Sequence, residues 1–452
     1  MKRIPFLAAG AILVAMTLVG CAPGASAPTT GDSTHKVVTD PKKMGKVTIT
    51  ILDAFTDNSS QIGKWINGVD ASFMKKYPNI TVQRKPENSG DINTSLRLRL
   101  ADASTPDIVP ANQGWQGVGD LGASGLLLNL DAYSKAYHWN TLLPKTIARQ
   151  HMVASDGKSI GDGSLYGMPI NQGSFITVFY NRADFQKLGL ALPKTLADFE
   201  SDLAAAKAAG IVPMQLGTQD QSATPTLLAL QDSYGDTSKI LNFVYGTGNV
   251  KLADTGMVQA ADTYAKWAKE GFFPKNFPGI NSGDASQKFV DGNGLFYFFY
   301  SGFLPFSSQA QGDKFGTFIL PREDGSPVTA TGSSTQNFSI AAKSKHPDAA
   351  ALWLNYSAST EAGKIAIQNG LIPIIGNWPA NTDSPLLNDG LNELSAINKN
   401  DGYVPYFDWS TPTMLDTLNQ QIALLLNGRA NGTQLVQAAQ TNYDAFQAKQ
   451  KG

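Results

Sequence analysis

Aromatic rings and uncharged amide side chains occur together in several loops that follow apolar segments of this sequence. These loops span residues 53–58, 112–115, 171–175, 219–221, 300–303 and 405–409. Amides, hydroxyls and carboxylates form hydrogen bonds with hydroxyl groups, and aromatic rings pack against flat C–H faces. The mixture therefore predicts a site for a polyhydroxylated small molecule such as a sugar. A loop aromatic packs against its own domain more often than against a ligand, so composition alone leaves each loop open.

Residues for metal or nucleophilic chemistry form no recognisable pattern. The histidines His35, His138, His151 and His346 are scattered, and none has another histidine or a cysteine at the spacing of a zinc site. No G-x-S-x-G motif occurs, and Cys21 is the only thiol. We therefore expect a binding protein without metal, cofactor or catalytic residues. A glycan-cleaving enzyme stays open as an alternative, because two carboxylates suffice for that reaction and sequence spacing cannot pair them.

The first 21 residues predict export and anchoring. Lys2 and Arg3 precede an apolar run at 6–19 that is too short for a comfortable membrane span, as in a signal peptide at 1–20. The run ends in Leu18-Val19-Gly20-Cys21, which resembles the lipobox of bacterial lipoproteins. That resemblance implies a lipid on Cys21 and a protein held at the extracytoplasmic face of the cell membrane. The alternative is an ordinary cleaved signal with a chance cysteine.

Composition also predicts how the rest of the chain is organised. Residues 21–46 are rich in Ala, Pro, Thr, Ser, Gly and Lys, so we expect a flexible tether. About 400 residues follow, more than one core usually organises, which favours two lobes. The 36 Lys and Arg residues nearly balance the 37 Asp and Glu residues, and no basic patch for nucleic acid is visible. No second apolar segment is long enough to cross a membrane.

Short apolar segments alternate with amphipathic ones, which is typical of an α/β chain whose helices cover mostly parallel sheets. Strands are expected at 47–52, 80–82, 107–109, 176–180, 211–216, 295–300 and 338–342. Helices are expected around 65–77, which Pro78 ends, at 96–101, from Thr195 to Gly210, at 349–357 and from Leu415 onward.

The order of several motifs resembles one family. The matching segments are FMKKYPNITV at 73–82, PDIV at 106–109 followed by Trp115, LYGMP at 165–169 leading into FYN at 179–181, and HPDAA at 346–350 with GLIP at 370–373. These segments are similar to the extracellular solute-binding proteins of ABC importers, of the carbohydrate type typified by maltodextrin-binding proteins. The likeness extends from Val47 to the C-terminus.

The resemblance implies two α/β lobes of the periplasmic-binding-protein type that close on a ligand. Lobe 1 would comprise 47–170 and 337–372, and lobe 2 would comprise 176–330 and 379–452. Hinge crossings would fall near 171–175, 331–336 and 373–378.

The resemblance and the aromatic and amide loops together give a set of candidate ligand-binding residues. They are Phe55, Asp57, Gln113, Trp115, Asn171, Ser174, Phe175, Gln219, Asp220, Tyr300, Phe303, Gln336, Asn337, Asp408 and Trp409. Neutral amides at two crossings favour an uncharged, polyhydroxylated ligand. The implied function is delivery of a sugar to the importer's permease subunits by a monomer. The same fold binding a polyol, a glycerol phosphodiester or a peptide is the alternative.

Overall fold

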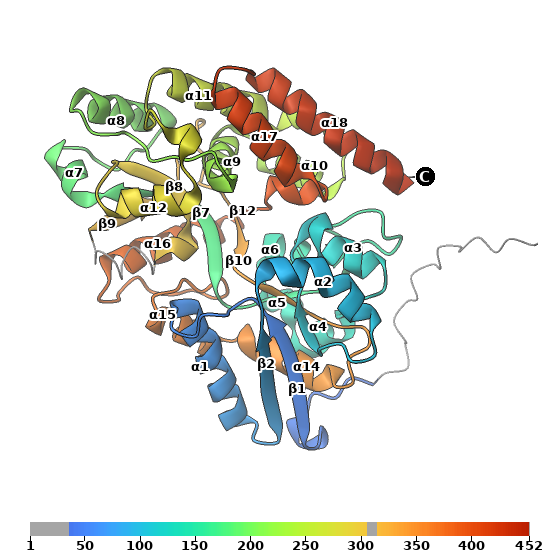
Figure 1. The fold of residues 1–452 in the computed structure, drawn as a ribbon. Coiled ribbons are helices and arrows are strands. Elements are labelled where there is room, and N and C mark those ends of the chain that lie inside the picture. Colours follow the sequence, from blue (N-terminus) through green and yellow to red (C-terminus); the bar gives the residue numbers. More distant parts are fainter. Residues whose placement is uncertain (1–35, 305–313, 452) are drawn as a thin grey trace, which may run out of the picture.

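Two β-sheets, one in each half of the molecule, organise the fold (Figure 1). The computed structural model describes residues 36–304 and 314–451. The first sheet has the strand order β2-β1-β3-β11-β6 and the second has the order β12-β10-β7-β8, with β9 also paired to β7. Helices pack around both sheets, so the expectation of a two-lobed α/β fold is confirmed.

The first sheet lies in the half that contains the beginning of the described chain. Its strands are β1 (Val47–Asp53), β2 (Ile80–Pro86), β3 (Ile108–Pro110), β6 (Met168–Pro169) and β11 (Asn337–Ile340). Its helices are α1 (Gln61–Lys76), α2 (Ser89–Ala101), α3 (Val118–Ala123), α4 (Asp131–Tyr137), α5 (Trp139–Leu142), α6 (Lys145–Arg149), α14 (Pro347–Ser357) and α15 (Thr360–Gln368). A small hairpin, β4 (Met152–Val153) with β5 (Ser164–Leu165), lies beside them.

The second sheet lies in the other half. Its strands are β7 (Gly173–Asn181), β8 (Phe296–Tyr300), β9 (Phe315–Phe318), β10 (Ala330–Ser334) and β12 (Tyr403–Val404). Its helices are α7 (Arg182–Lys187), α8 (Leu196–Ala208), α9 (Thr224–Tyr234), α10 (Thr237–Tyr245), α11 (Met257–Lys269), α12 (Ser282–Val290), α16 (Pro385–Lys399), α17 (Met414–Leu426) and α18 (Gly432–Lys451).

Helix boundaries follow from capping residues that the sequence displays. The Ser60 side chain accepts from the Gly63 N–H at the start of α1, which ends at Tyr77, before Pro78. The face that α1 buries includes Trp65, Val69 and Phe73, as the spacing predicts. Helix α8 starts in a capping box between Thr195 and Asp198, and the left-handed Gly210 (φ 76°) follows its end.

Strand direction differs from the expectation of mostly parallel sheets. Among the described strands, β1 pairs in parallel with β2 and β3, and β10 pairs in parallel with β12. The remaining strand pairs of both sheets are antiparallel. The reason is that the chain crosses from one half to the other just before β7 and again between β10 and β11. These three strands therefore run antiparallel to neighbouring strands of their sheets.

The prediction of a strand at 211–216 is wrong. This segment forms a single parallel bridge, between Met214 and Phe296. The Pro213 carbonyl and the Gln215 N–H form the bonds to Phe296 on either side of this pair, but Pro213 has no N–H with which to continue the ladder. The ladder therefore stops after one residue pair.

The end of the expected tether is also not free. Residues 41–43 form the 3-10 helix η1 (Pro41–Lys43), and the Val38 N–H bonds to Asp348 at 3.1 Å. The Asn79 amide donates to the carbonyls of Pro41 (2.9 Å) and Gly45 (2.7 Å), beside the amino ends of β1 and β2. Residues 36–46 therefore lie against the first half, whereas the rest of the expected tether, 21–35, falls outside the described residues, as does the expected signal peptide.

Three segments connect the halves, and Asn171 joins two of them. Its side-chain N–H donates to the Ser359 carbonyl (3.0 Å), its side-chain oxygen accepts from the Ile375 N–H (2.8 Å), and its exposed fraction is 0%. The Gly173 N–H bonds to the Ile372 carbonyl, and the Thr335 N–H bonds to the Gln172 carbonyl. The connections near 171–173, 335 and 372–375 are thus hydrogen-bonded to one another.

No helix within residues 36–304 and 314–451 has both the length and the apolar character needed to cross a bilayer.

Glu393 on α16 is a buried carboxyl group with an unfavourable environment. The hydroxyls of Thr317 and Thr177 are its nearest polar partners, and their effect on its pKa is smaller than that of burial. Burial raises its pKa from 4.5 to about 8, because a charge is poorly solvated in the interior. The folded protein therefore binds this proton more tightly than the unfolded chain, so stability is lost as pH rises from 4.5 through 8.

We predict that Glu393→Gln removes this loss. The difference in unfolding free energy between the variant and the wild type should grow by roughly 3 kcal/mol in favour of the variant between pH 4.5 and pH 7.5. Urea denaturation at several pH values measures it, with the exposed Glu323→Gln as the matched control. A pH-independent difference would contradict the assignment of a neutral buried carboxyl.

Candidate ligand-binding cleft

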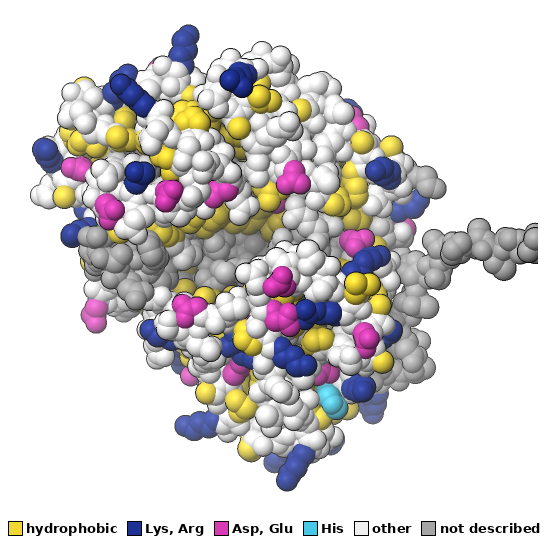
Figure 2. Space-filling view, in the orientation of Figure 1, with side chains coloured by type: hydrophobic (Ala, Val, Ile, Leu, Met, Phe, Trp, Pro, Cys, Tyr) yellow, Lys and Arg dark blue, Asp and Glu magenta, His cyan; other side chains and the backbone are white. Residues whose placement is uncertain are grey.

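A cleft of about 360 Å³ lies where the two halves face one another. Figure 2 shows the hollow between the upper and lower parts of the surface. Its lining residues come from the loop after β3, the crossing strands β7 and β10, the end of β8, the start of α9 with the residues before it, the segment after β12 and the start of α17. They are Asn112, Gln113, Ser174, Gln221, Thr224, Tyr300, Ser333, Ser334, Thr335, Tyr406, Asp408, Trp409 and Leu415.

Three aromatic rings form one wall of the cleft. Tyr300 is the last residue of β8. Tyr406 directly precedes the 3-10 helix η7 (Phe407–Ser410), and Trp409 lies within it. The ring centroids of Tyr300 and Tyr406 are 6.1 Å apart, and those of Tyr406 and Trp409 are 5.0 Å apart. Burial raises the pKa of both tyrosines, so their hydroxyls stay protonated at neutral pH and can donate hydrogen bonds. The wall offers flat apolar faces with polar edges.

Asp408 is the one charged side chain among the described lining residues. Its exposed fraction is 8%, and burial raises its pKa to about 6. Gln116 donates from its side chain to the Asp408 carbonyl at 3.1 Å. Because no Lys or Arg stands among the described lining residues, the cleft offers no cationic partner for a phosphate or a carboxylate.

Other residues that line the cleft are polar and neutral. Gln113 in the loop after β3 donates from its side chain to the Ser333 hydroxyl at 2.6 Å. Gly114 lies directly against Trp409, and a β-carbon on this glycine would come within 2.2 Å of the Trp409 β-carbon. With a φ of +71°, the position requires glycine for its backbone as well. This close approach brings the amide wall and the aromatic wall together.

The structure places five of the residues predicted from the sequence in the cleft: Gln113, Ser174, Tyr300, Asp408 and Trp409. The remaining lining residues lie beside them. Tyr406 and Asn112 fall within the aromatic and amide loops noted in the sequence, whereas Thr224, Leu415 and the serines of β10 carry no signal of their own. Small hydroxyl side chains are common everywhere, so only their position on the crossing strand reveals them.

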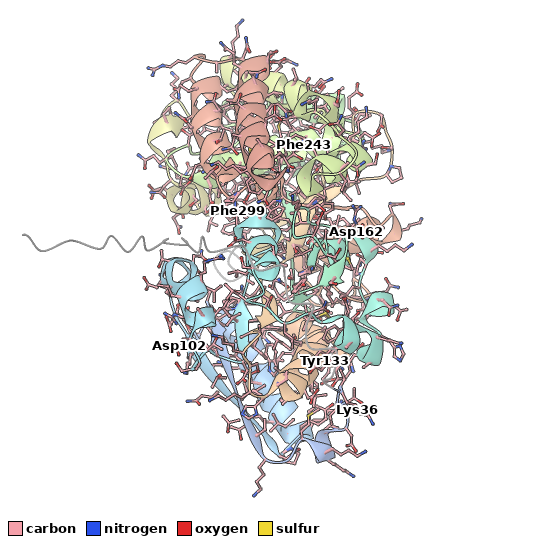
Figure 3. All side chains as sticks on the ribbon, turned by 90° about the vertical axis from the view of Figure 1, so that its right-hand side faces the viewer. Lys36, Asp102, Tyr133, Asp162, Phe243 and Phe299 are labelled. Carbon is pink, nitrogen blue, oxygen red and sulfur yellow. The ribbon has the colours of Figure 1, made fainter. Side chains whose placement is uncertain are left out.

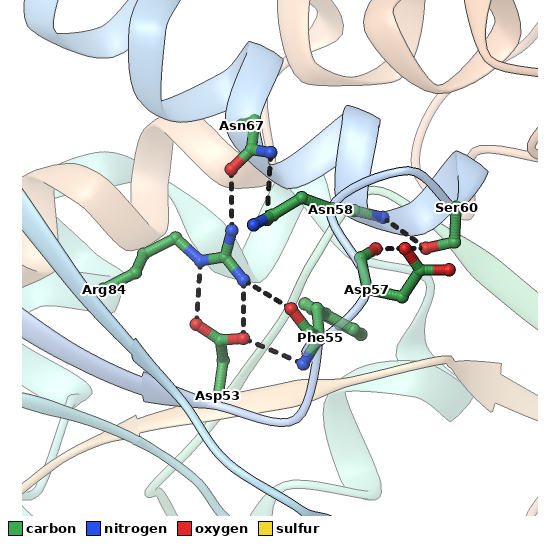
Figure 4. Close-up of polar contacts among 8 residues, drawn as sticks. Asp53, Phe55, Asp57, Asn58, Ser60, Asn67 and Arg84 are labelled. Atoms are coloured by element: carbon green, nitrogen blue, oxygen red, sulfur yellow. Dashed lines mark hydrogen bonds and ion pairs between the residues drawn. The ribbon is translucent and has the colours of Figure 1, made fainter.

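The first loop, with Phe55 and Asp57, does not line this cleft. Arg84 pairs with the buried Asp53 through two hydrogen bonds of 2.8 and 2.7 Å and also holds the Phe55 carbonyl and Asn67 (Figure 4). The Phe55 side chain is 8% exposed and belongs to the core. Asp57 accepts hydrogen bonds from Ser59, which lower its pKa. Both side chains support the fold of this loop.

Trp115, Phe175 and Phe303 pack in the interior. Trp115 is 3% exposed, and its ring meets the ring of Phe446 on α18 edge-on, with centroids 5.2 Å apart. Phe303 packs edge-on against Phe179 at 5.4 Å. These rings build the floor and sides behind the cleft and do not line it.

The other predicted residues lie in the crossings or on the outside. Asn171 and Asn337 are buried, and the Asn337 amide donates to the Ala111 carbonyl at 2.9 Å. Gln336 is partly buried, and its carbonyl accepts from the Ser334 hydroxyl. Gln219 is exposed. The Asp220 carboxylate accepts from the backbone N–H groups of Ser222 and Ser282, both at 2.9 Å.

A second, more open groove of about 770 Å³ runs between α8 and α11 on the outer surface. Alanines line its floor, and Glu200, Lys207, Lys266 and Glu270 surround it. Lys266 pairs with Glu200, and Lys207 donates to the Glu270 carbonyl, so these groups are already satisfied. The smaller cleft is the candidate site, because polar groups and rings from both halves converge there.

Comparisons with known proteins agree with this arrangement. A family model described as "Bacterial extracellular solute-binding protein" matches residues 57–364. The chain is 22% identical over 395 residues to an uncharacterized ABC transporter extracellular-binding protein of Pyrococcus horikoshii, covering 84% of this chain and 81% of that protein. It is 25% identical over 331 residues to the multiple sugar-binding protein of Streptococcus mutans, covering 71% and 73%.

Among solved structures, a chitin oligosaccharide binding protein has the same fold. It superimposes with a TM-score of 0.72 at 19% identity and covers 89% of this chain and 99% of its own. The family match covers more than half of the chain, and the fold and cleft are consistent with it. The chain therefore belongs to the bacterial extracellular solute-binding protein family.

Proposed function

We propose that the protein captures an uncharged carbohydrate in this cleft and delivers it to the permease of an ABC importer. The observation that carries the proposal is the cleft itself, which is lined by the rings of Tyr300, Tyr406 and Trp409 together with neutral amides and hydroxyls. Sugar rings present C–H faces to aromatic groups and hydroxyls to polar ones. The name of the Streptococcus mutans relative, a multiple sugar-binding protein, supports the same ligand class.

Capture works through closure of the two lobes about the three crossing segments. We assign lobe 1 to 47–170 and 337–372 and lobe 2 to 176–330 and 379–452, with hinges near 171–175, 331–336 and 373–378. A ligand that contacts both walls stabilises the closed arrangement over the open one by the contacts that exist only there. The permease then distinguishes the loaded carrier by the closed positions of the lobes, and a single copy of the chain suffices.

Anchoring is a separate part of the proposal. Cys21, which lies outside the described residues, would carry a lipid and hold the protein at the extracytoplasmic face of the membrane. A tethered carrier stays at high effective concentration near its permease.

Ligand screening tests the central proposal. Thermal unfolding of the purified chain from Cys21 onward should shift upward with one or more neutral sugars among D-glucose, D-galactose, D-xylose, maltose and raffinose. Sugar phosphates, amino acids and short peptides should leave the melting temperature unchanged. Shifts with peptides or amino acids alone would overturn the carbohydrate assignment. Turnover of a chromogenic glycoside by the same protein would instead favour the enzyme alternative.

Tyr300→Ala should separate binding from stability. Removing this ring from the cleft wall should weaken affinity for the identified sugar by about tenfold or more, as loss of a stacked ring does at a binding site. The matched control is Phe299→Ala. Phe299 is the neighbouring residue, does not line the cleft, and lies at the lower edge of the upper half (Figure 3). Calorimetric titration of both variants decides, and equal losses in the two would contradict a direct role for Tyr300.

Cys21→Ser should release the protein from the membrane. The variant lacks the thiol that accepts the lipid, so it should appear in the soluble fraction, whereas the wild type should partition into detergent. Fractionation of expressing cells followed by immunoblotting measures this. A Cys21→Ser protein that still sediments with membranes would refute the lipid anchor.

A further inference from the structure

A chain of three polar side chains runs from the cleft into the interior. Gln113 donates to the Ser333 hydroxyl (2.6 Å), Ser333 donates to the Gln150 side-chain oxygen (2.6 Å), and Gln150 donates to the Gly332 carbonyl (3.0 Å). The exposed fractions of Gln113, Ser333 and Gln150 are only 2% to 3%. Gln113 and Ser333 line the cleft, but Gln150, which follows α6, does not.

The Gly332 carbonyl, at the interior end of the chain of side chains, determines which group donates and which accepts in each of these hydrogen bonds. The Gly332 carbonyl can only accept, so Gln150 must present its N–H to it and turn its oxygen toward Ser333. That oxygen can only accept, so the single hydroxyl proton of Ser333 is committed to it. The Ser333 oxygen then accepts from Gln113, which must present its own N–H in turn.

The consequence appears at the cleft. With the Gln113 nitrogen held by Ser333, its side-chain oxygen is the group that remains to meet a ligand in the cleft that Gln113 lines. An amide oxygen is an acceptor with no proton to give. A ligand that covers this oxygen without offering a donor leaves a buried acceptor unpaired, which costs about 1–3 kcal/mol.

We propose that Gln150 is a positioning residue that fixes the Gln113 oxygen as an obligatory acceptor, so that the cleft selects a ligand hydroxyl able to donate at this position. This inference rests on the proposed function and adds a specificity rule to it. The Ser333 backbone pairs with Ser174 across β10 and β7, so the arrangement is built into the crossing strands. No contact between Gln150 and the ligand is required.

Two substitutions at position 150 separate polarity from packing. Gln150→Met keeps the length of the side chain but removes both hydrogen-bonding groups, so Ser333 becomes free to donate to Gln113 and the Gln113 amide can turn over. Gln150→Glu is the matched control. A buried carboxyl group is protonated readily, and in that form it donates to Gly332 and accepts from Ser333, which preserves the direction of the chain.

Deoxyfluoro sugars measure the selection, because fluorine replaces a hydroxyl without a proton to donate. D-glucose, D-galactose and their 2-, 3-, 4- and 6-deoxyfluoro derivatives are titrated calorimetrically into the wild type and both variants. In the wild type, the derivative at one ring position should bind about tenfold or more weakly than its parent. Gln150→Met should bring that ratio close to one, and Gln150→Glu should retain it. The same ratio in all three proteins would overturn the proposal.

A ligand-free measurement keeps this test independent of the proposed function. In protein labelled with ¹⁵N in glutamine side chains, the Gln113 amide protons, assigned by their loss in Gln113→Leu, should exchange slowly with solvent. Gln150→Met should make them exchange at least about tenfold faster, and Gln150→Glu should not. If none of the neutral sugars binds, the proposed ligand class fails, while this exchange still decides the polarity of the chain. Equal exchange in the wild type and Gln150→Met would overturn it.

Discussion

The structure depends on one buried amide at the point where its halves meet. Asn171 has no exposed surface, yet its side chain satisfies a carbonyl of the segment after α14 and an N–H of the segment after α15. Irregular backbone inside a protein carries polar groups that must be paired, and an Asn side chain can serve as donor and acceptor at once. The crossing segments can therefore run side by side through the interior, and the cleft opens next to them because β7 and β10 leave this junction in register.

Local signals in the sequence predict much of the fold. Ser60 and Pro78 bound α1, and Thr195 with Gly210 bounds α8, because capping and chain termination depend on a few neighbouring residues. Strand direction was predicted less well, since it depends on which distant segments pair. The segment 211–216 shows the limit: its composition fits a strand, but Pro213, which has no N–H to donate, confines it to one bridge.

The cleft was predicted in part, for a similar reason. Trp115 and Trp409 follow short apolar segments in much the same way, but only Trp409 lines the cleft, because α18 supplies Phe446 to cover Trp115. Phe55 was predicted to contact ligand, but Arg84 and Asp53 hold its loop against the core. Whether a loop ring meets ligand depends on what the distant chain places over it, and one sequence does not display that. Ser333 and Gln150 could not have been singled out, because their roles arise from a contact between residues 183 positions apart.

The docked segment at 36–46 has a consequence for how the protein would stand on a cell. Asn79 and Asp348 hold this segment at the amino ends of β1 and β2, whereas the cleft lies beyond their carboxyl ends. With a lipid on Cys21, the 15 residues from 21 to 35 would lie between the anchor and the docked segment. A stretch of 15 residues spans at most about 50 Å when it is fully extended. That length would limit how far the first half can stand from the bilayer.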